Sequence, residues 1–135
     1  MLYRNNYQPS ARYPEPSATI CVWALAAGTE AEARRLLMTR EFWRVGFEKG
    51  IRSALITPEE AAAYPYTEQE RATIEKLRSR AIVGTAEQVG ARLNELAQRF
   101  KLDEIVIVTW THDPAPRRRS YELLAEAFAL DARTD

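Results

Sequence analysis

The chain has 135 residues, of which 46% are hydrophobic and 28% are charged. This composition is that of one globular domain and excludes a fibrous or disordered chain. Nineteen Lys and Arg residues balance nineteen Asp and Glu residues, so the charge predicts neither a nucleic-acid partner nor a membrane partner.

The chain contains one cysteine, Cys21, so no internal disulfide can form and nothing indicates an oxidising compartment. Residues 1–16 lack the apolar segment of a signal peptide. No stretch approaches the ~18 consecutive apolar residues that a membrane span needs. We therefore expect a soluble cytoplasmic protein.

The first 17 residues are expected to form an extended connecting arm, because their three prolines disfavour helix. Residues 18–25 (ATICVWAL) follow as a nearly continuous apolar run with β-branched and aromatic residues. A run without alternation is typical of a strand buried on both faces, as in a parallel sheet. On this reading Cys21 is an inert, buried thiol.

Four threonines, each followed three positions later by Glu or Gln, predict four helix starts. They are Thr29, Thr57, Thr67 and Thr85. The first helix should run to about Lys49, with Gly50 as its stop. Residues 51–82 are interpreted as an excursion that holds a short helix and a surface helix.

After Thr85, apolar residues recur at the spacing of an amphipathic helix. They are Val89, Leu93, Leu96 and Phe100. Residues 104–111 (EIVIVTWT) predict a second strand buried on both faces. A loop over 112–116, a helix over 117–130 and a frayed tail over 131–135 complete the expected order.

Strands that are each followed by a helix predict parallel pairing with right-handed crossovers. Two parallel strands alone leave open edges and two faces to cover, and so small a sheet is rarely stable by itself. We therefore interpret residues 18–130 as α/β, with two parallel strands and about five helices. They would be β/α units of an incomplete (β/α)₈ barrel.

Five segments of the chain, taken in order, resemble stretches of one enzyme family. They are Gln8-Pro-Ser10, residues 22–33 (VWALAAGTEAEA), residues 83–89 (VGTAEQV), residues 103–108 (DEIVIV), and the set Asp113, Arg117, Ser120, Tyr121 and Glu122. They are similar to the region around the seventh and eighth barrel strands of bacterial luciferase-like, flavin-dependent monooxygenases. Ala86 stands where that family frequently has proline.

The resemblance covers about residues 5–130 and implies an FMN-dependent (β/α)₈ barrel. Such enzymes use reduced flavin and dioxygen to oxidise a small organic substrate. Only the C-terminal portion is matched, so barrel strands one to six and most of the flavin site are expected upstream of Met1. The chain alone is then expected to be inactive. It would need a complementary N-terminal chain or association into a homo-oligomer.

His112, the only histidine, follows the second predicted strand, at the functional end of a parallel barrel. In the context of the resemblance it is the candidate catalytic residue, since imidazole can hydrogen-bond the substrate or a peroxyflavin oxygen. The alternative is a loop histidine satisfied by solvent or by Asp113. With one His and one Cys in the chain, no metal site built from these ligands is expected.

Trp110, Thr111 and Arg117 are the candidate cofactor-binding residues. Trp110 and Thr111 could line a flavin or substrate pocket at the strand end, or could pack between barrel and helices. Arg117 opens the basic run 117–119 at a helix start, where it could bind phosphate. It could equally belong to a solvated cluster paired with Asp113 or Glu122. Trp23 and Leu25 share one face of the first strand, and the sequence leaves open which face points into the barrel.

Two other functions remain open at this point. The chain could be a non-catalytic α/β interaction module that self-associates, or binds a partner, through exposed sheet edges. It could also be an unrelated small α/β enzyme, although it lacks HExxH, CxxC, GxSxG, GxGxxG and P-loop patterns. We expect the isolated chain to be oligomeric or partly molten because its parallel strands are uncapped.

Overall fold

The computed structural model describes residues 2–130. The elements are α1 (Leu2–Asn5), β1 (Thr19–Ala26), α2 (Glu30–Glu48), α3 (Pro58–Ala63), α4 (Glu68–Arg80), β2 (Ile82–Gly84), α5 (Ala86–Phe100), β3 (Glu104–Val108) and α6 (Pro114–Ala127). The predicted tail over 131–135 lies outside the described residues.

The sheet has three parallel strands in the order β2-β1-β3. The parallel pairing of the two predicted strands is confirmed. The third strand, β2, was missed because it has only three residues and lies inside the predicted excursion. Gly84 ends β2 where a Cβ atom would clash with the Gln88 side chain, and Gln88 is needed to cap α5.

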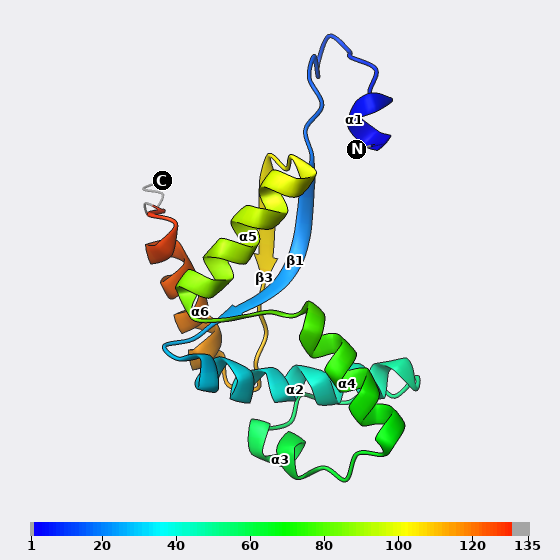
Figure 1. Ribbon diagram of the computed structural model, residues 1–135, viewed down its shortest axis with the longest axis vertical. Coiled ribbons are helices and arrows are strands. Elements are labelled where there is room, and N and C mark those ends of the chain that lie inside the picture. The colour runs from blue at the N-terminus through cyan, green and yellow to red at the C-terminus, as the bar shows by residue number, and fades with distance from the viewer. Residues whose placement is uncertain (1, 131–135) are drawn as a thin grey trace.

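One face of the sheet is covered by α5 and α6 (Figure 1). Even-numbered residues of β1 point to this side, where Ala24 and Ala26 form a core with Val89 and Leu93 of α5 and Leu124 of α6. The amphipathic stripe predicted for α5 is therefore confirmed at Val89 and Leu93, whereas Phe100, at the end of the helix, is exposed. This core is built entirely from residues of the described chain.

The other face is covered only at its carboxyl end, where α2 crosses the strands (Figure 1). Leu25 packs there on Ala33 and Leu36 of α2. Further up the sheet, Cys21, Val106 and Val108 are exposed. The prediction that both strands are buried on both faces, with Cys21 inside, is wrong for this chain because no described segment covers the upper part of this face.

The helix starts follow the predicted caps. Thr57, Thr67 and Thr85 each form a reciprocal capping box with the residue three positions on. At Thr29 only half of the box forms, since the Glu32 carboxylate pairs with Arg35 instead of returning to the cap. Helix α6 begins at Pro114, three residues before the prediction, because Asp113 acts as its N-cap and proline fits the first turn.

Two consecutive residues of α6 hold the carboxyl ends of two strands. The hydroxyl of Ser120, fully buried, accepts the Ala26 amide of β1 at 2.9 Å. The Tyr121 hydroxyl accepts the amide of Thr109, just past β3, at 2.8 Å. Ser120 and Tyr121, two residues of the family-like motif, therefore fasten strands in this chain.

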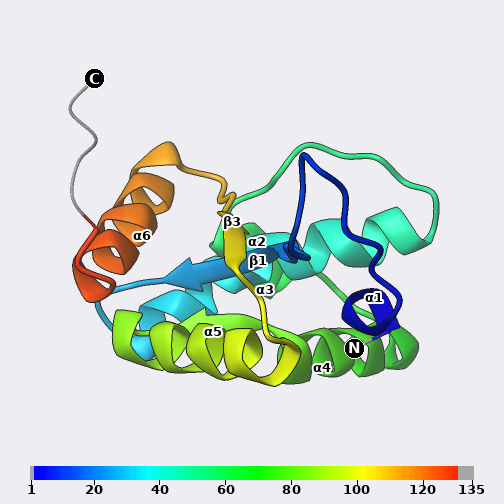
Figure 2. The same cartoon turned by 90° about the horizontal axis from the view of Figure 1, so that it is seen from above.

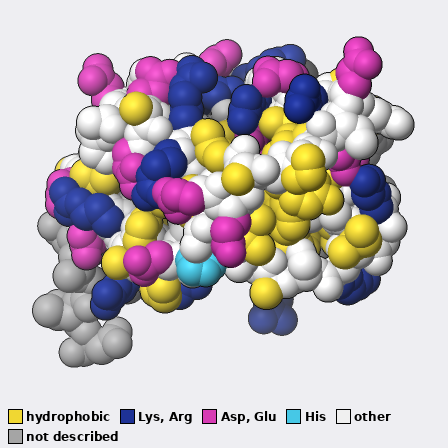
Figure 3. All heavy atoms as spheres, turned by 90° about the horizontal axis from the view of Figure 1, so that it is seen from below, with side chains coloured by type: hydrophobic (Ala, Val, Ile, Leu, Met, Phe, Trp, Pro, Cys, Tyr) yellow, Lys and Arg dark blue, Asp and Glu magenta, His cyan; other side chains and the backbone are white. Residues whose placement is uncertain are grey.

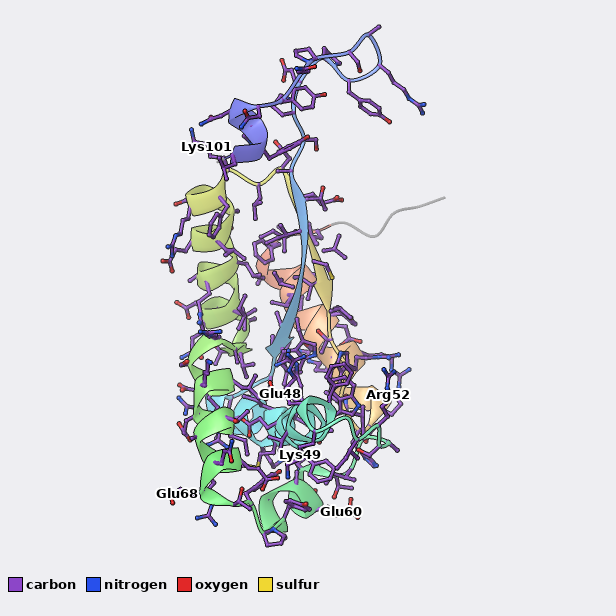
Figure 4. All side chains as sticks on the ribbon, turned by 90° about the vertical axis from the view of Figure 1, so that its right-hand side faces the viewer. Glu48, Lys49, Arg52, Glu60, Glu68 and Lys101 are labelled. Carbon is purple, nitrogen blue, oxygen red and sulfur yellow. The ribbon has the colours of Figure 1, made fainter. Side chains whose placement is uncertain are left out.

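The arm predicted to be extended contains one short helix, α1, beside the end of α5 at the amino end of the sheet (Figure 2). Arg4 of α1 donates to the carbonyl oxygens of Pro16 and Lys101 and pairs with Asp103 at 2.5 Å. Lys101 lies at this end in Figure 4, opposite the layer of α2, α3 and α4. The arm is thus bound to the edge of the sheet where the strands begin, away from their carboxyl ends.

Candidate functional site

Four aromatic rings meet where the open sheet face reaches α2. Trp23 of β1 and Trp110, two residues past β3, contact edge-on with ring centroids 6.1 Å apart. Trp43 of α2 contacts Trp110 at 5.2 Å and stacks on Phe47 at 5.0 Å. We call these four rings, with the arginines described next, the aromatic corner.

The sequence places these rings by three simple spacings. Trp23 pairs in register with Val108, so Trp110 continues past the strand end beside it. Trp43 and Phe47 are four residues apart and therefore lie on one side of α2. The unsettled orientation of Trp23 is now decided, since Trp23 points away from α5 and α6 toward the face where α2 crosses.

Three arginines pack on the rings of the aromatic corner. The guanidinium carbon of Arg40 lies 4.3 Å from the Trp23 ring centroid and 5.8 Å from that of Trp110. Arg44 and Arg52 lie 5.6 Å and 5.7 Å from the Phe47 centroid. Stacking of this kind stabilises a cation through the quadrupole of the ring.

Arg40 carries a charge that no described carboxylate neutralises. Its Nε atom is buried and makes no hydrogen bond within residues 2–130, and the same holds for Nε1 of Trp23. The neighbouring Glu41 is engaged by Arg78 at 2.6 Å and 2.9 Å. Burial, followed by repulsion from Arg44, lowers the pKa of Arg40, and Glu41 opposes this shift.

His112 lies in a different hollow. Its side chain is exposed and, with Arg35, Thr57 and Pro58, it lines a depression of about 240 Å³ beside the start of α3. Figure 3 shows this end of the molecule, where the histidine lies among acidic, basic and hydrophobic side chains. The pKa of nearby Glu60 is lowered, mainly by the backbone amide of Thr57 and least by His112.

The two remaining predicted site residues, Thr111 and Arg117, are not part of the aromatic corner. Thr111 is buried, and its hydroxyl donates to the carbonyl oxygen of Asp113. Arg117 is exposed in the first turn of α6, and it is Arg119 that pairs with Glu122, at 3.0 Å. Of the four predicted residues, only Trp110 belongs to the aromatic corner.

Sequence reasoning missed Arg40 as a site residue. The available signal was its position three residues before Trp43, on a helix that follows a strand carrying Trp23. That spacing places a cation and a ring on one helix side, but it does not reveal which strand residues they meet.

The sequence of this chain is similar to those of several bacterial proteins, some of which are named as monooxygenases. No family model matches the sequence. The chain is 33% identical over 127 residues to YceB, an uncharacterized protein of Bacillus subtilis (strain 168), covering 94% of this chain and 38% of YceB. It is 27% identical over 122 residues to a luciferase-like monooxygenase of Escherichia coli (strain K12), covering 90% and 36%.

Two further proteins are similar to this chain. The N-acetyl-S-alkylcysteine monooxygenase of Bacillus subtilis (strain 168) is 30% identical over 108 residues, covering 80% of this chain and 32% of that protein. The crystal structure of apo-MsnO8 superposes with a TM-score of 0.84 at 29% identity, covering 97% of this chain and 40% of the other. This chain therefore spans less than two fifths of YceB and about two fifths of MsnO8.

Between residues 2 and 130, no helix has the length and hydrophobicity needed to cross a bilayer. Within the same range, no three His, Cys, Asp or Glu side chains are grouped as metal ligands.

Proposed function

We propose that this chain is the C-terminal part of a luciferase-like, flavin-dependent monooxygenase, with residues 18–130 forming the last units of a (β/α)₈ barrel. The observation that carries the proposal is the extent of the similarity. It runs through 90% of this chain and only 36% of the luciferase-like monooxygenase from Escherichia coli. The relatives are thus much longer than the region they share with this chain.

The aromatic corner fits one side of a flavin. Its rings offer an apolar wall, and its guanidinium groups offer donors to oxygen atoms or to a phosphate. We propose FMN as the flavin. When bound, reduced flavin supplies two electrons to dioxygen, so that one oxygen atom enters a small organic substrate and the other leaves as water.

Four residues of the chain are proposed to serve this site in the complete protein. Trp110 would line the flavin or substrate pocket, and Thr111 would hold the turn that positions it. His112 would hydrogen-bond the substrate, which requires the substrate to reach the hollow beside α3. Arg117, exposed at the start of α6, would contact the flavin phosphate.

The open sheet face supports the proposal that other strands complete the barrel. Val106 and Val108 are 46% and 40% exposed on the face that carries Trp23. Strands from a complementary N-terminal chain, or from further copies of this one, would cover them. Alone, the chain is proposed to be inactive.

The test is a titration of FMN, oxidised and reduced, into the purified chain. It is repeated after mixing with the part of the Escherichia coli luciferase-like monooxygenase that lies outside the matched region. We expect saturable flavin binding in the mixture, weakened by Trp110→Leu. The absence of flavin binding both alone and in the mixture would refute the flavin proposal.

The exposed sheet face also favours a second candidate, a non-catalytic module that self-associates. The same valines that strands of a barrel would cover could pair with those of a second copy. A stable homodimer that binds no flavin in either arm of the titration would favour this candidate.

A further inference from the structure

The aromatic corner holds more positive charge than the surrounding residues balance. Arg40, Arg44 and Arg52 all pack on its rings. Among residues 2–130, Arg44 is the only one of these three with a carboxylate within ion-pair distance, Glu48 at 3.5 Å. At that separation in partly exposed surroundings the pair contributes little.

Several acids of α2, α3 and α4 are engaged by other basic residues. Glu41 is held by Arg78, and Glu70 by Lys49. Glu32 and Glu59 both pair with Arg35, at the start of α2 and far along that helix from the corner. Within residues 2–130, therefore, no carboxylate lies within ion-pair distance of the Arg40 guanidinium.

The geometry around Arg40 defines what could neutralise it. One face of the guanidinium lies on Trp23, and Trp110 flanks it, so an approaching group reaches the terminal nitrogens from the open side. Those nitrogens present parallel N–H donors that match two oxygen atoms in one plane. Next to them stand aromatic rings that suit a flat, apolar body.

We propose that Arg40 binds the oxyanion of a planar ligand, either a carboxylate or a phosphate monoester, whose flat body rests against Trp110 and Trp43. The inference deepens the proposed function, because the same corner would then receive either an acidic substrate or the flavin phosphate. It does not depend on that function, since any flat acid would satisfy the same geometry.

The chain contains its own reporter for this site. All three of its tryptophans lie in the aromatic corner, so intrinsic tryptophan emission reports on the corner alone. Two pairs of probes separate the sources of the oxyanion. Benzoate and benzamide share a ring and differ in the charged carboxylate, while FMN and riboflavin share a ring system and differ in the phosphate.

The test variant is Arg40→Gln, which keeps a polar side chain and removes the charge. The matched control is Arg99→Gln, because Arg99 also stacks on an aromatic ring, Phe100, at 5.3 Å but near the end of α5. Arg52→Gln is a second corner variant. Arg52 is exposed, so its substitution leaves the fold intact if Arg40→Gln should impair folding.

We expect the acid of at least one pair to quench emission saturably, with an affinity on the order of tenfold or more above that of its neutral partner. Arg40→Gln should abolish this preference, Arg52→Gln should reduce it, and Arg99→Gln should leave it unchanged. A preference for benzoate identifies a carboxylate ligand, and a preference for FMN identifies the phosphate.

Three results overturn the inference: no saturable change with either acid, equal affinity of both members of each pair, or an acid preference that survives Arg40→Gln in a folded protein. Failure of the proposed function is distinguishable. If benzoate binds with dependence on Arg40 while neither flavin binds alone or in the mixture, the oxyanion site stands and the flavin assignment falls.

Discussion

The two faces of the sheet differ in whether this chain can complete them. On the α5 and α6 side, Ala24, Ala26, Val89 and Leu93 are almost fully buried. On the opposite side, α2 covers only the carboxyl end, and Cys21, Val106 and Val108 remain exposed. Both faces belong to the same strands, so strand sequence alone does not determine burial.

The difference teaches where stability and where function should reside. The face covered by α5 and α6 buries its apolar side chains within this chain, so it should contribute most of the free energy of unfolding. The open face is packed only at its carboxyl end, where it gathers three tryptophans together with Arg40 and Arg52. Neither of these two arginines has an ion-pair partner within residues 2–130. Substitutions on the two faces should therefore separate cleanly into those that unfold the chain and those that change what it binds.

The largest expected effect comes from the covered face. Leu93→Ala removes a side chain that is 3% exposed and leaves a cavity between α5 and the sheet. We expect a loss of about 2–5 kcal/mol in the free energy of unfolding, measured by urea denaturation. Val108→Ala is the control on the open face and should cost roughly 0.5 kcal/mol or less. Similar losses for both variants would mean that the open face is covered in solution.

A smaller loss is expected from the buried hydroxyl that fastens β1. Ser120→Ala leaves the Ala26 amide buried without its acceptor, which should cost about 1–3 kcal/mol. Ser79→Ala removes an exposed hydroxyl that only bonds within its own helix, and it should be nearly neutral. Denaturation curves of the two variants, recorded side by side, test the assignment. An equal change in the free energy of unfolding for both variants would contradict the proposal that Ser120 stabilises the end of β1.

The open face should also govern association. A lysine at position 106 puts charge on the exposed surface without entering the core, so Val106→Lys should weaken self-association on the order of tenfold. Sedimentation velocity over a range of concentrations measures this effect. Arg80→Glu changes charge away from this face and serves as the control. A monomeric wild-type chain with a sharp, cooperative melt would contradict the expectation that the uncovered strands make it oligomeric or partly molten.

The smallest effect concerns the layer of α2, α3 and α4, which depends on ion pairs. A hydrogen bond from Lys49, followed by the backbone amide of Thr67, lowers the pKa of Glu70 to about 2. Since the folded pKa lies below the ordinary value of 4.5, this stabilisation is fully present above about pH 4.5 and disappears as the pH falls toward 2. The stability difference between wild type and Glu70→Gln should shrink over that window in acid titrations of the melting temperature. Glu68→Gln, in the same helical turn, is the control and should not reproduce this pH dependence.

Much of the fold could be predicted from the sequence because its signals are local. Threonine followed by Glu or Gln three residues later located the starts of α3, α4 and α5, and the β-branched runs located β1 and β3. The strand β2 was not predicted, because three residues carry too little pattern to distinguish a strand from a loop. The error over double burial has a different cause. A strand sequence that suits burial on both faces does not reveal which residues cover each face, and residues 2–130 cover the second face only at its carboxyl end, through α2.

The site was less predictable than the fold, because it depends on which distant residues meet. Trp110 was predicted to be a site residue from its place at a strand end. It contacts Trp23 there, and its part in a cofactor site stays a prediction. His112, chosen by the same argument, and Arg117, chosen from its place at a helix start, face other surroundings. The turn after β3 and the early start of α6 direct them elsewhere. Arg40 was missed because its role arises from the crossing of α2 over β1, which no local spacing encodes.

The pair of bonds from Ser120 and Tyr121 has a geometric consequence for any larger sheet. Ala24 of β1 lies level with Thr109, whose hydroxyl donates to the Ala24 carbonyl oxygen at 2.5 Å. Ser120 holds Ala26, two residues further along β1, while Tyr121 holds Thr109. One dipeptide of a helix therefore sets how far one strand can slide against the next. In a closed barrel that stagger, summed around the ring, fixes the tilt of the strands and the width of the interior.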